Sequence, residues 1–323
     1  MIFAADVGGT NARLGLFERS GARLDALATK TYPSRQHTSL EEIVERFMAE
    51  HPSTPKRACV AIAGPVNGGR AIATNLAWNV DARRLGRAVG LRDVDLINDL
   101  EAVAHGLGDL AHADVAVLHP GAPGTEGNRA VIAAGTGLGE AGAYWDGRRH
   151  HPFAGEGGHT DFGPRTPGEI ELLTRLMARF DRVSYERLLS GSGLREIYEF
   201  LRDRRHAEEP GWLRQQFADD PAPVVIVRNA LEGRSEICLE AVDHFVSIYG
   251  AEAGNLALKV MARGGVWIAG GIAPRIVPRM RTPAFLEAFF AKGRMRRVLE
   301  GMAVRVILND KVGLIGAARY AIR

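Results

Sequence analysis

A short run near the start of the chain combines an acid, two glycines and a hydroxyl in an order suited to holding a polyphosphate. Asp6-Val7-Gly8-Gly9-Thr10 ends an apolar stretch that predicts a buried strand, and Arg13 adds a positive charge. Gly8 and Gly9 can take positive φ, as a tight hairpin turn requires, and without Cβ atoms their N–H groups can converge on an anion. Asp6 is placed to hold Mg²⁺, directly or through water. An ordinary hairpin is the alternative, but the flanking acid and hydroxyl favour a nucleotide.

A second glycine turn occurs in the middle of the chain. Gly135-Thr136-Gly137-Leu138-Gly139 follows the apolar residues 130–134 and leads into residues 140–145, so both turns join strands. The chain has no Gly-Lys-Ser/Thr run, which argues against a P-loop enzyme, and no Gly-x-Gly-x-x-Gly that opens a helix after a strand, which argues against a dinucleotide fold. A plain turn also explains the second run taken alone. The two together indicate a hairpin-based ATPase.

Asp99 is the candidate general base. It follows the apolar residues 94–97 and Asn98, and it stands at the start of a helix predicted over 100–107. The helix dipole and the free N–H groups there favour an ionised carboxylate, which could accept a proton from an attacking hydroxyl. The alternative is that Asn98 or Asp99 only caps the helix.

Acids and a histidine among glycines form the candidate sugar site. In Gly155-Glu156-Gly157-Gly158-His159-Thr160-Asp161 the polar residues lie on a segment too irregular for a core. Such a loop suits a polyhydroxy ligand, whose hydroxyls both donate and accept hydrogen bonds. A plain surface loop is the alternative. Glu186 alone is more typical of an exposed helix acid.

The elements that must position these residues fall into two α/β units. In the first, strands are predicted at 2–7, after Thr10, and at 24–32, 57–66, 70–74 and 94–97, with helices at 39–50, after Asp81 and at 100–107. In the second, strands are predicted at 115–119, 130–134, 140–145, 265–269 and 304–308, with an irregular segment at 148–164, helices from 166 to about 263, and a last helix at 314–321. Capping boxes begin the helices after Ser39 and Thr166. The same hairpin module therefore appears twice.

Composition is that of a globular protein without an obvious charged partner. The chain has 323 residues, which favours two domains, and a net charge of +3. Its basic clusters, at 292–297 and 202–205, are more typical of solvated faces than of a nucleic-acid surface. Cys59 and Cys238 are far apart, as expected for reduced thiols, and offer no zinc-ligand spacing. No signal peptide and no apolar run near ~18 residues is found, so we expect a soluble cytoplasmic protein without a membrane partner.

Taken together, the motifs resemble the bacterial glucokinases of the actin-like sugar-kinase superfamily, in the branch without the zinc-bound cysteine cluster of the repressor/kinase (ROK) branch. The resemblance rests on six runs in the family's order, which span nearly the whole chain. They are 5–13, 97–100, 134–139, 155–162, 189–194 and 269–275. It implies an α/β, two-domain, actin-like (ribonuclease H-like) fold with the active site in the interdomain cleft. The smaller domain would comprise 1–110 plus 309–323, and the larger one 111–308.

The resemblance also assigns roles to residues. It implies sugar contacts from Asn98, Asp99, Glu156, His159 and Glu186, with Asp99 as the catalytic base. It implies phosphate binding by Ala5, Asp6, Val7, Gly8, Gly9, Thr10, Gly135, Thr136 and Gly137, with Gly270 and Gly271 near the adenosine. ATP and Mg²⁺, with Asp6 near the metal, and no zinc are implied, as is a homodimer. The chain departs from the family at Asn75-Leu76-Ala77-Trp78, which predicts a different lid between the domains.

The expected reaction is transfer of the ATP γ-phosphoryl group to the 6-hydroxyl of glucose, at the entry to glycolysis. A kinase for another hexose, such as mannose or an amino sugar, is the first alternative. A non-catalytic sugar sensor would need a DNA-binding domain, for which the segment before the first strand leaves no room. An actin-like chaperone or filament ATPase would not need the polar loop 156–161.

Overall fold

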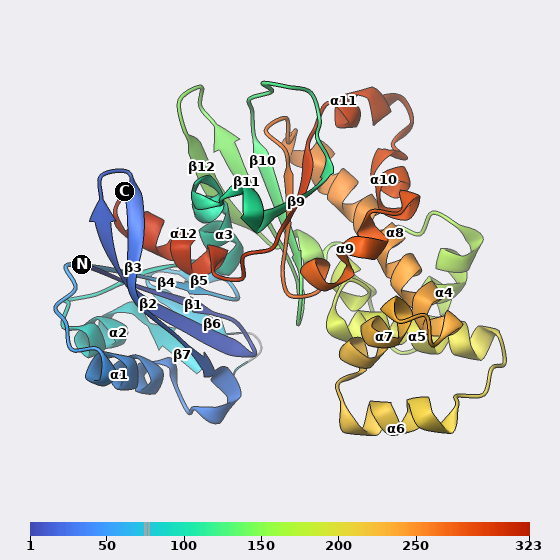
Figure 1. Ribbon diagram of the computed structural model, residues 1–323, viewed down its shortest axis with the longest axis horizontal. Helices are drawn as coiled ribbons and strands as arrows, with labels where there is room; N and C mark the ends of the chain where they lie inside the picture. The colour runs from blue at the N-terminus through green and yellow to red at the C-terminus, as the bar shows by residue number, and fades with distance from the viewer. Residues whose placement is uncertain (74–75, 77) are drawn as a thin grey trace.

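Two mixed β-sheets with the same strand order form the framework of the chain (Figure 1). The computed structural model describes residues 1–73, 76 and 78–323. The strands of the first sheet are ordered β3 (Arg23–Pro33), β2 (Asn11–Ser20), β1 (Ile2–Val7), β4 (Arg57–Ile62) and β8 (Asp95–Asn98). β1 is antiparallel to β2 and parallel to β4. Asn75 and Ala77, in the run where the chain departs from the family, lie outside the described residues.

The second sheet repeats this plan and adds one strand. Its strands are ordered β12 (His150–Gly155), β11 (Leu138–Trp145), β10 (Arg129–Ala134), β13 (Val266–Ala269), β14 (Val304–Ile307) and β9 (Val115–His119). β10 is antiparallel to β11 and parallel to β13, so it takes the place that β1 has in the first sheet. The duplicated hairpin module predicted from the sequence is therefore confirmed, as is the mixed α/β class.

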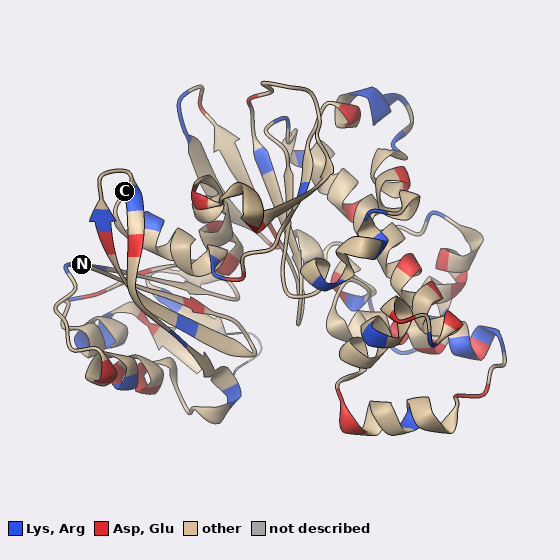
Figure 2. Cartoon of the chain, in the orientation of Figure 1, with Lys and Arg blue, Asp and Glu red and all other residues tan. Residues whose placement is uncertain are grey.

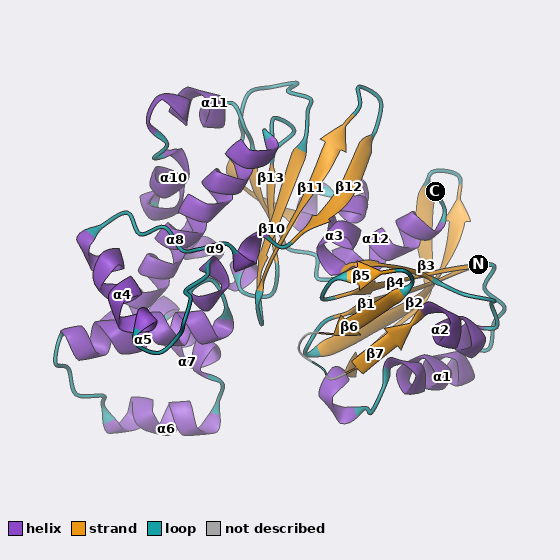
Figure 3. Cartoon of the chain, turned by 180° about the vertical axis from the view of Figure 1, so that it is seen from behind, coloured by secondary structure: helices purple, strands orange, loops and turns teal. Residues whose placement is uncertain are grey.

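Helices cover both faces of each sheet. α1 (Leu40–Glu50) and α2 (Ala82–Val89) pack on the outer face of the first sheet. α3 (Asp99–Gly106) and α12 (Val312–Ala321) lie between the two sheets, as Figures 1 and 3 show from opposite sides. Since their apolar side chains contact both sheets, these two helices connect the two cores.

α3 and α12 pack with almost no side chain between them. A Cβ atom on Gly316 would overlap the carbonyl oxygen of Ala102, and one on Gly106 would overlap that of Val312. Only glycine allows backbones to approach this closely. The middle and end of α3, the helix that begins at Asp99, are therefore held firmly against α12.

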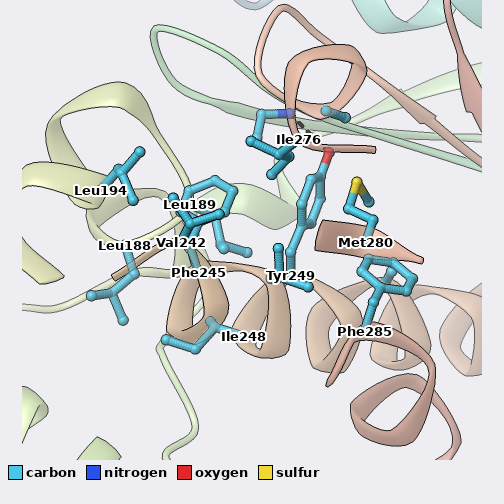
Figure 4. Packing of buried hydrophobic residues seen from close by; sticks show 14 of the residues in the cluster. Leu188, Leu189, Leu194, Val242, Phe245, Ile248, Tyr249, Ile276, Met280 and Phe285 are labelled. Atoms are coloured by element: carbon cyan, nitrogen blue, oxygen red, sulfur yellow. Dashed lines mark hydrogen bonds between the residues drawn. The ribbon is translucent and has the colours of Figure 1, made fainter. Parts of the chain in front are cut away.

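The remaining helices form the large core behind the second sheet. They are α4 (Pro167–Met177), α5 (Gly191–Arg204), α6 (Gly211–Asp219), α7 (Ala222–Leu231), α8 (Glu236–Val260), α9 (Ala273–Met280), α10 (Pro283–Phe290) and α11 (Arg296–Glu300). α8 runs through this core, and Figure 4 shows its Tyr249 between Ile276 and Met280. The Tyr249 hydroxyl accepts a hydrogen bond from the N–H of Ala134 (3.1 Å), at the end of β10.

Two predictions about strands are wrong. The segment 148–164 is not irregular throughout, because β12 pairs antiparallel with β11. Its polar residues are tolerated there because an edge strand is only partly covered. The predicted strand 57–66 ends at Ile62, after which Gly64 has a positive φ of 125° and the chain enters a small sheet of β5 (Val66–Asn67), β6 (Arg70–Ala73) and β7 (Trp78–Asp81).

The expected caps are present, and basic residues of the two clusters form ion pairs. Ser39 and Thr166 each accept a hydrogen bond from the N–H three residues on, at the starts of α1 and α4. Acidic and basic residues are interspersed over the surface (Figure 2). Basic-cluster members have acidic partners, as in Arg205–Glu240 (2.6 Å) and Arg296–Glu300 (2.7 Å). None of the helices in the described part of the chain combines the length and apolar character that a membrane crossing needs.

Candidate active site

The two glycine turns meet at one cavity because each follows the equivalent strand of its sheet. A cavity of about 220 Å³ is lined by Gly8 and Gly9 after β1 and by Gly135, Thr136 and Gly137 after β10. The candidate sugar residues line the same cavity. These are Asn98, Asp99, Glu156, His159 and Glu186. Residues far apart in the sequence are thus brought together as the motifs predicted.

Two further cavities adjoin the first. The larger, of about 1180 Å³, shares both turns with it and extends past Thr10, Gly271 and Arg275 to α5 and α7. A cavity of about 410 Å³ lies beside Asp6, Asp99, Gly270 and Gly271. The small cavity has the size of a monosaccharide site, and the large one has room for a nucleotide.

The glycines at the cavity are needed for different reasons than predicted. Neither Gly8 nor Gly9 has positive φ, so the expectation that the hairpin requires it is wrong. A Cβ on Gly8 would come no closer than 3.6 Å to another atom, and one on Gly271 would meet nothing within 4 Å. The protein itself would accept a side chain at these positions, and both face the cavities. At both positions, therefore, the space needed by a ligand explains the glycine, and the packing of the protein does not.

Gly270 is different from its neighbour. Its φ is +86°, and a Cβ there would overlap the carbonyl oxygen of Ala134. This glycine is required because the chain leaving β13 passes very close to the end of β10, whatever binds nearby.

The two glycine turns use their backbone N–H groups in the same way at equivalent positions. The N–H of Gly8 donates to Asn11 O (2.9 Å) and that of Gly135 to Gly137 O (2.9 Å), so both are used within their turns. Among the described residues, no protein acceptor is found for the N–H groups of the two residues that follow in each turn. These are Gly9, Thr10, Thr136 and Gly137. They are the donors available to a polyphosphate.

Asn98 and Asp99 share the start of α3 but differ in role. The Asn98 side chain is the N-cap: its oxygen accepts from Leu100 N (2.9 Å) and Glu101 N (3.3 Å), and its nitrogen donates to Gly64 O (3.3 Å). Asp99 is half-buried and accepts one hydrogen bond from Leu100 N (2.9 Å). Burial, and after it the charge of Asp6, raises the pKa of Asp99 to about 7. The hydrogen bonds at the helix start lower the pKa of Asp99, as the sequence led us to expect, but burial, which the sequence did not reveal, outweighs them.

Asp6 lies in a tight, charged corner beneath the first turn. Burial raises its pKa to about 6, against the attraction of Arg13, whose guanidinium is 4.0 Å away, and Asp310 adds to the rise. Arg13 also donates to Asp310 (3.2 Å). A Cβ on Gly313, in the first turn of α12, would stand 2.8 Å from the Asp6 carboxylate, so the helix start packs directly on the acid.

The other three sugar candidates form a row. His159 lies 4.0 Å from Glu156 and 3.9 Å from Glu186, counted between ring nitrogen and carboxylate oxygen. Glu186 also accepts a hydrogen bond from Leu138 N (3.0 Å), at the end of the second glycine turn. A Cβ on Gly137 would overlap that carboxylate. Glu186 is therefore joined to the phosphate turn, and is not an isolated exposed acid.

Sequence reasoning missed two acids near the site. Glu140 lines the small cavity and is 3% exposed. Asp310 lines the cavity beside Asp6 and pairs with Arg13. The signal for Glu140 was an acid directly after a glycine turn inside an otherwise apolar strand. No signal distinguished Asp310.

Two similar sheets, each presenting a glycine turn to a cavity lined by acids, are the arrangement of an actin-like fold. Comparison with protein families then gives a definite assignment. The model of the Glucokinase family matches residues 3–323, and the chain belongs to that family, of the bacterial type outside the ROK branch. The predicted function, an ATP-dependent hexose kinase of the glucokinase type, is confirmed by this match.

Similar proteins cover the whole length. A glucokinase of Nostoc punctiforme is 41% identical over 100% of this chain and 99% of its own. The crystal structure of a glucokinase from an Antarctic psychrotroph is 30% identical, with a TM-score of 0.84 over 99% of this chain and 98% of that one. A glucokinase of Balamuthia mandrillaris, solved in complex with glucose, has a TM-score of 0.81 at 20% identity over 100% of this chain and 93% of that one, which shows the shared fold.

Proposed function

We propose that the protein transfers the γ-phosphoryl group of ATP to the 6-hydroxyl of glucose, giving glucose 6-phosphate and ADP. The observation that carries the proposal is the small cavity in which both glycine turns, Asp99 and the row of Glu156, His159 and Glu186 meet. Relatives named glucokinase, one of them bound to glucose, support the choice of sugar.

The proposal includes two domains that close on the substrates. The smaller comprises 1–110 plus 309–323 and the larger 111–308. In support, each sheet has its own apolar core, and α12, from the end of the chain, returns to pack on β1 and β4. Closure around a cleft between the domains would exclude water and suppress ATP hydrolysis.

Asp99 is the general base of the proposed reaction. A pKa near the working pH suits a base that must be ionised yet accept a proton. Because phosphoryl transfer has a loose transition state, Asp99 would orient the sugar hydroxyl and take its proton late. Positioning by the rigid start of α3 would contribute more than the basicity of the carboxylate.

The two turns would hold the phosphates, with the residues around Gly270 and Gly271 near the adenosine. Free N–H groups of Gly9, Thr10, Thr136 and Gly137 would stabilise charge on the transferred group. Val7 and Ala5, in β1, would contribute by placing the first turn.

Mg²⁺ fits the acidic corner at Asp6, because three carboxyl groups of like charge, those of Asp6, Asp99 and Asp310, act on one another there, while Arg13 offsets the charge of Asp6. Among the described residues no group of three or more His, Cys, Asp or Glu side chains is arranged as metal ligands. We therefore propose that Asp6 holds the ion largely through water. When bound, Mg²⁺ neutralises phosphate charge.

Glu156, His159 and Glu186 would bind the sugar hydroxyls. Carboxylates accept hydrogen bonds and a neutral imidazole offers one donor and one acceptor, so the row can order several hydroxyls. Asn98, whose side chain is mainly used to cap α3, would add a contact at the edge.

The test is ADP release by purified protein with Mg·ATP, comparing glucose, mannose, fructose, N-acetylglucosamine and no sugar. Strong turnover with glucose would support the proposal. Turnover with another sugar alone would keep the mechanism and change the substrate, and ATP binding without sugar-dependent turnover would contradict the proposed catalysis.

Two further properties belong to the proposal. A reducing, cytoplasmic location is supported by the buried free thiols of Cys59 and Cys238. A homodimer is implied by the family resemblance, and light scattering should then give twice the mass of the chain.

A further inference from the structure

A pair of buried carboxyl groups lies directly behind the sugar-binding row. Glu140, in β11, is 3% exposed and Glu252, in α8, is 0% exposed. The two are close enough for the charge of Glu252 to act on Glu140. Charged side chains are rarely buried this deeply unless they are paired, so the pair requires an explanation.

Glu140 touches the loop that carries Glu156 and His159. A Cβ on Gly157 would overlap the carboxylate oxygen of Glu140, and one on Gly158 would overlap the carbonyl oxygen of Leu138. The loop therefore rests on the start of β11, with Gly158 against the backbone and Gly157 against the Glu140 side chain. Any shift of the Glu140 carboxyl must move Gly157.

We propose that Glu140 is a positioning residue for sugar binding: its carboxyl group, paired with Glu252, sets the place of Gly157 and through it of Glu156 and His159. The inference rests on the function proposed for this cavity, in which those two side chains bind the sugar.

The two carboxyl groups can form a hydrogen bond to each other only if one of them is protonated. Among the described residues, no hydrogen-bond partner is found for the buried Oε1 of Glu140. A protonated Glu140 instead donates to Glu252, which removes both the unpaired oxygen and the repulsion. Burial, and after it the charge of Glu252, raises the pKa of Glu140 to about 8, against the attraction of Lys259.

Glu252 is well supplied with hydrogen-bond donors. It accepts from Asn255 (2.8 Å) and Lys259 (3.4 Å). Asn255 also contacts Lys292 (2.6 Å) and the hydroxyl of Tyr185 (3.1 Å), next to Glu186. The charged or titratable groups facing Glu140 are Glu252, Lys259 and Tyr249 on α8. On its cavity side they are Asp99, Glu156, His159 and Glu186. Tyr185 and Lys292 join the network through their hydrogen bonds with Asn255. Arg165 joins it through its charge, which acts on Lys292.

The sign of the pH effect follows from the pair. Below pH ~8 Glu140 is protonated and the loop is held. Above it, Glu140 ionises beside a carboxylate, the contact to Gly157 is disturbed, and glucose binding weakens. ATP binding, which uses other residues, should not follow the same titration.

The experiment compares wild type with Glu140→Gln, which keeps the shape and can still donate to Glu252 but cannot ionise. Between pH 7 and pH 9.5 the KM for glucose of the wild type should rise about fivefold, the scale of one lost hydrogen bond, while that of Glu140→Gln stays flat. The KM for ATP should change equally in both. An alkaline rise of the same size in Glu140→Gln would overturn the proposal.

A second measurement does not require catalysis. Hydrogen exchange in the peptide 155–163, corrected for the intrinsic effect of pH, should lose protection above pH 8 in the wild type and keep it in Glu140→Gln. Equal behaviour of the two would overturn the inference even in a protein that phosphorylates no sugar. Conversely, absence of sugar-dependent turnover with the expected exchange pattern would count against the proposed function and not against the pairing.

Discussion

Asp6, at the end of β1, and Asp99, in the first turn of α3, line one cavity, and the charge of Asp6 adds to burial in raising the pKa of Asp99 to about 7. In the proposed mechanism, the acid beneath the first glycine turn adjusts the base that receives the sugar proton. The proposal therefore couples phosphate binding to proton transfer through this pair.

Replacing Asp99 by asparagine should remove the base and keep the shape. We expect Asp99→Asn to lower kcat at least ~100-fold, the usual scale for loss of a general base, while glucose still binds. Asp95→Asn, at the exposed start of the strand that leads to Asp99, is the matched control and should leave kcat unchanged. Near-normal turnover of Asp99→Asn, measured by coupled ADP release, would remove Asp99 from this role.

The pH profile should report the interaction of the two acids. Because Asp99 must be ionised, kcat/KM for glucose should rise with pH up to about 7, before the alkaline fall expected from Glu140. Asp6→Asn removes a like charge, lowers the pKa of Asp99 and moves this acid limb to lower pH, whatever its effect on the absolute rate. Asp310→Asn is the control, since Asp310 acts on Asp6 and is not among the causes of the Asp99 shift. An acid limb that stays in place in Asp6→Asn would contradict the coupling.

The open glycines should tolerate a methyl group in folding but not in nucleotide binding. Gly271→Ala has room in the protein, so its melting temperature should stay near that of the wild type, while the KM for ATP rises about tenfold, equivalent to ~1.4 kcal/mol. Gly108→Ala, equally open but not among the cavity-lining residues, should change neither quantity. Gly270→Ala should instead lower the melting temperature, because of its positive φ and the overlap with Ala134. Unaltered ATP kinetics in Gly271→Ala would mean that the ATP site lies elsewhere.

Tyr249→Phe should loosen the second phosphate turn from behind. The change leaves the N–H of Ala134, the residue before Gly135, without its partner in a fully buried place. We expect a loss of about 1–3 kcal/mol in the free energy of unfolding, measured by urea denaturation, and a higher KM for ATP. Tyr144→Phe, at an exposed site on β11, is the control. If Tyr249→Phe has the same free energy of unfolding as the wild type, the hydrogen bond of the hydroxyl does not stabilise the protein.

Local patterns were enough to predict most of the framework. The apolar run before Gly8-Gly9, the caps at Ser39 and Thr166 and the two glycine turns gave β1, the starts of α1 and α4, and the duplicated hairpins. These features depend on residues close in sequence. The segment 148–164 was misjudged because an edge strand with polar residues shows no alternation to read.

The site was predicted by its residues but not by its electrostatics. Asp99 looks ionised when only its helix is considered, and its raised pKa comes from burial and from Asp6, which is far away in sequence. Glu140 reads as an unremarkable acid until Gly157 and Glu252 are placed against it. Such effects arise from tertiary contacts, which spacing does not contain.

The glycine contact between α3 and α12 also has a consequence for the order in which the chain can fold. During synthesis, the first sheet and α3 leave the ribosome long before residues 312–321, which complete the apolar face on which α3 rests. Until those last residues emerge, the helix that carries Asp99 lacks its principal neighbour. The first sheet and α3 are therefore synthesised early but are completed only when α12 has emerged. A chain that lacks only α12 should keep the second sheet intact and leave Asp99 disordered.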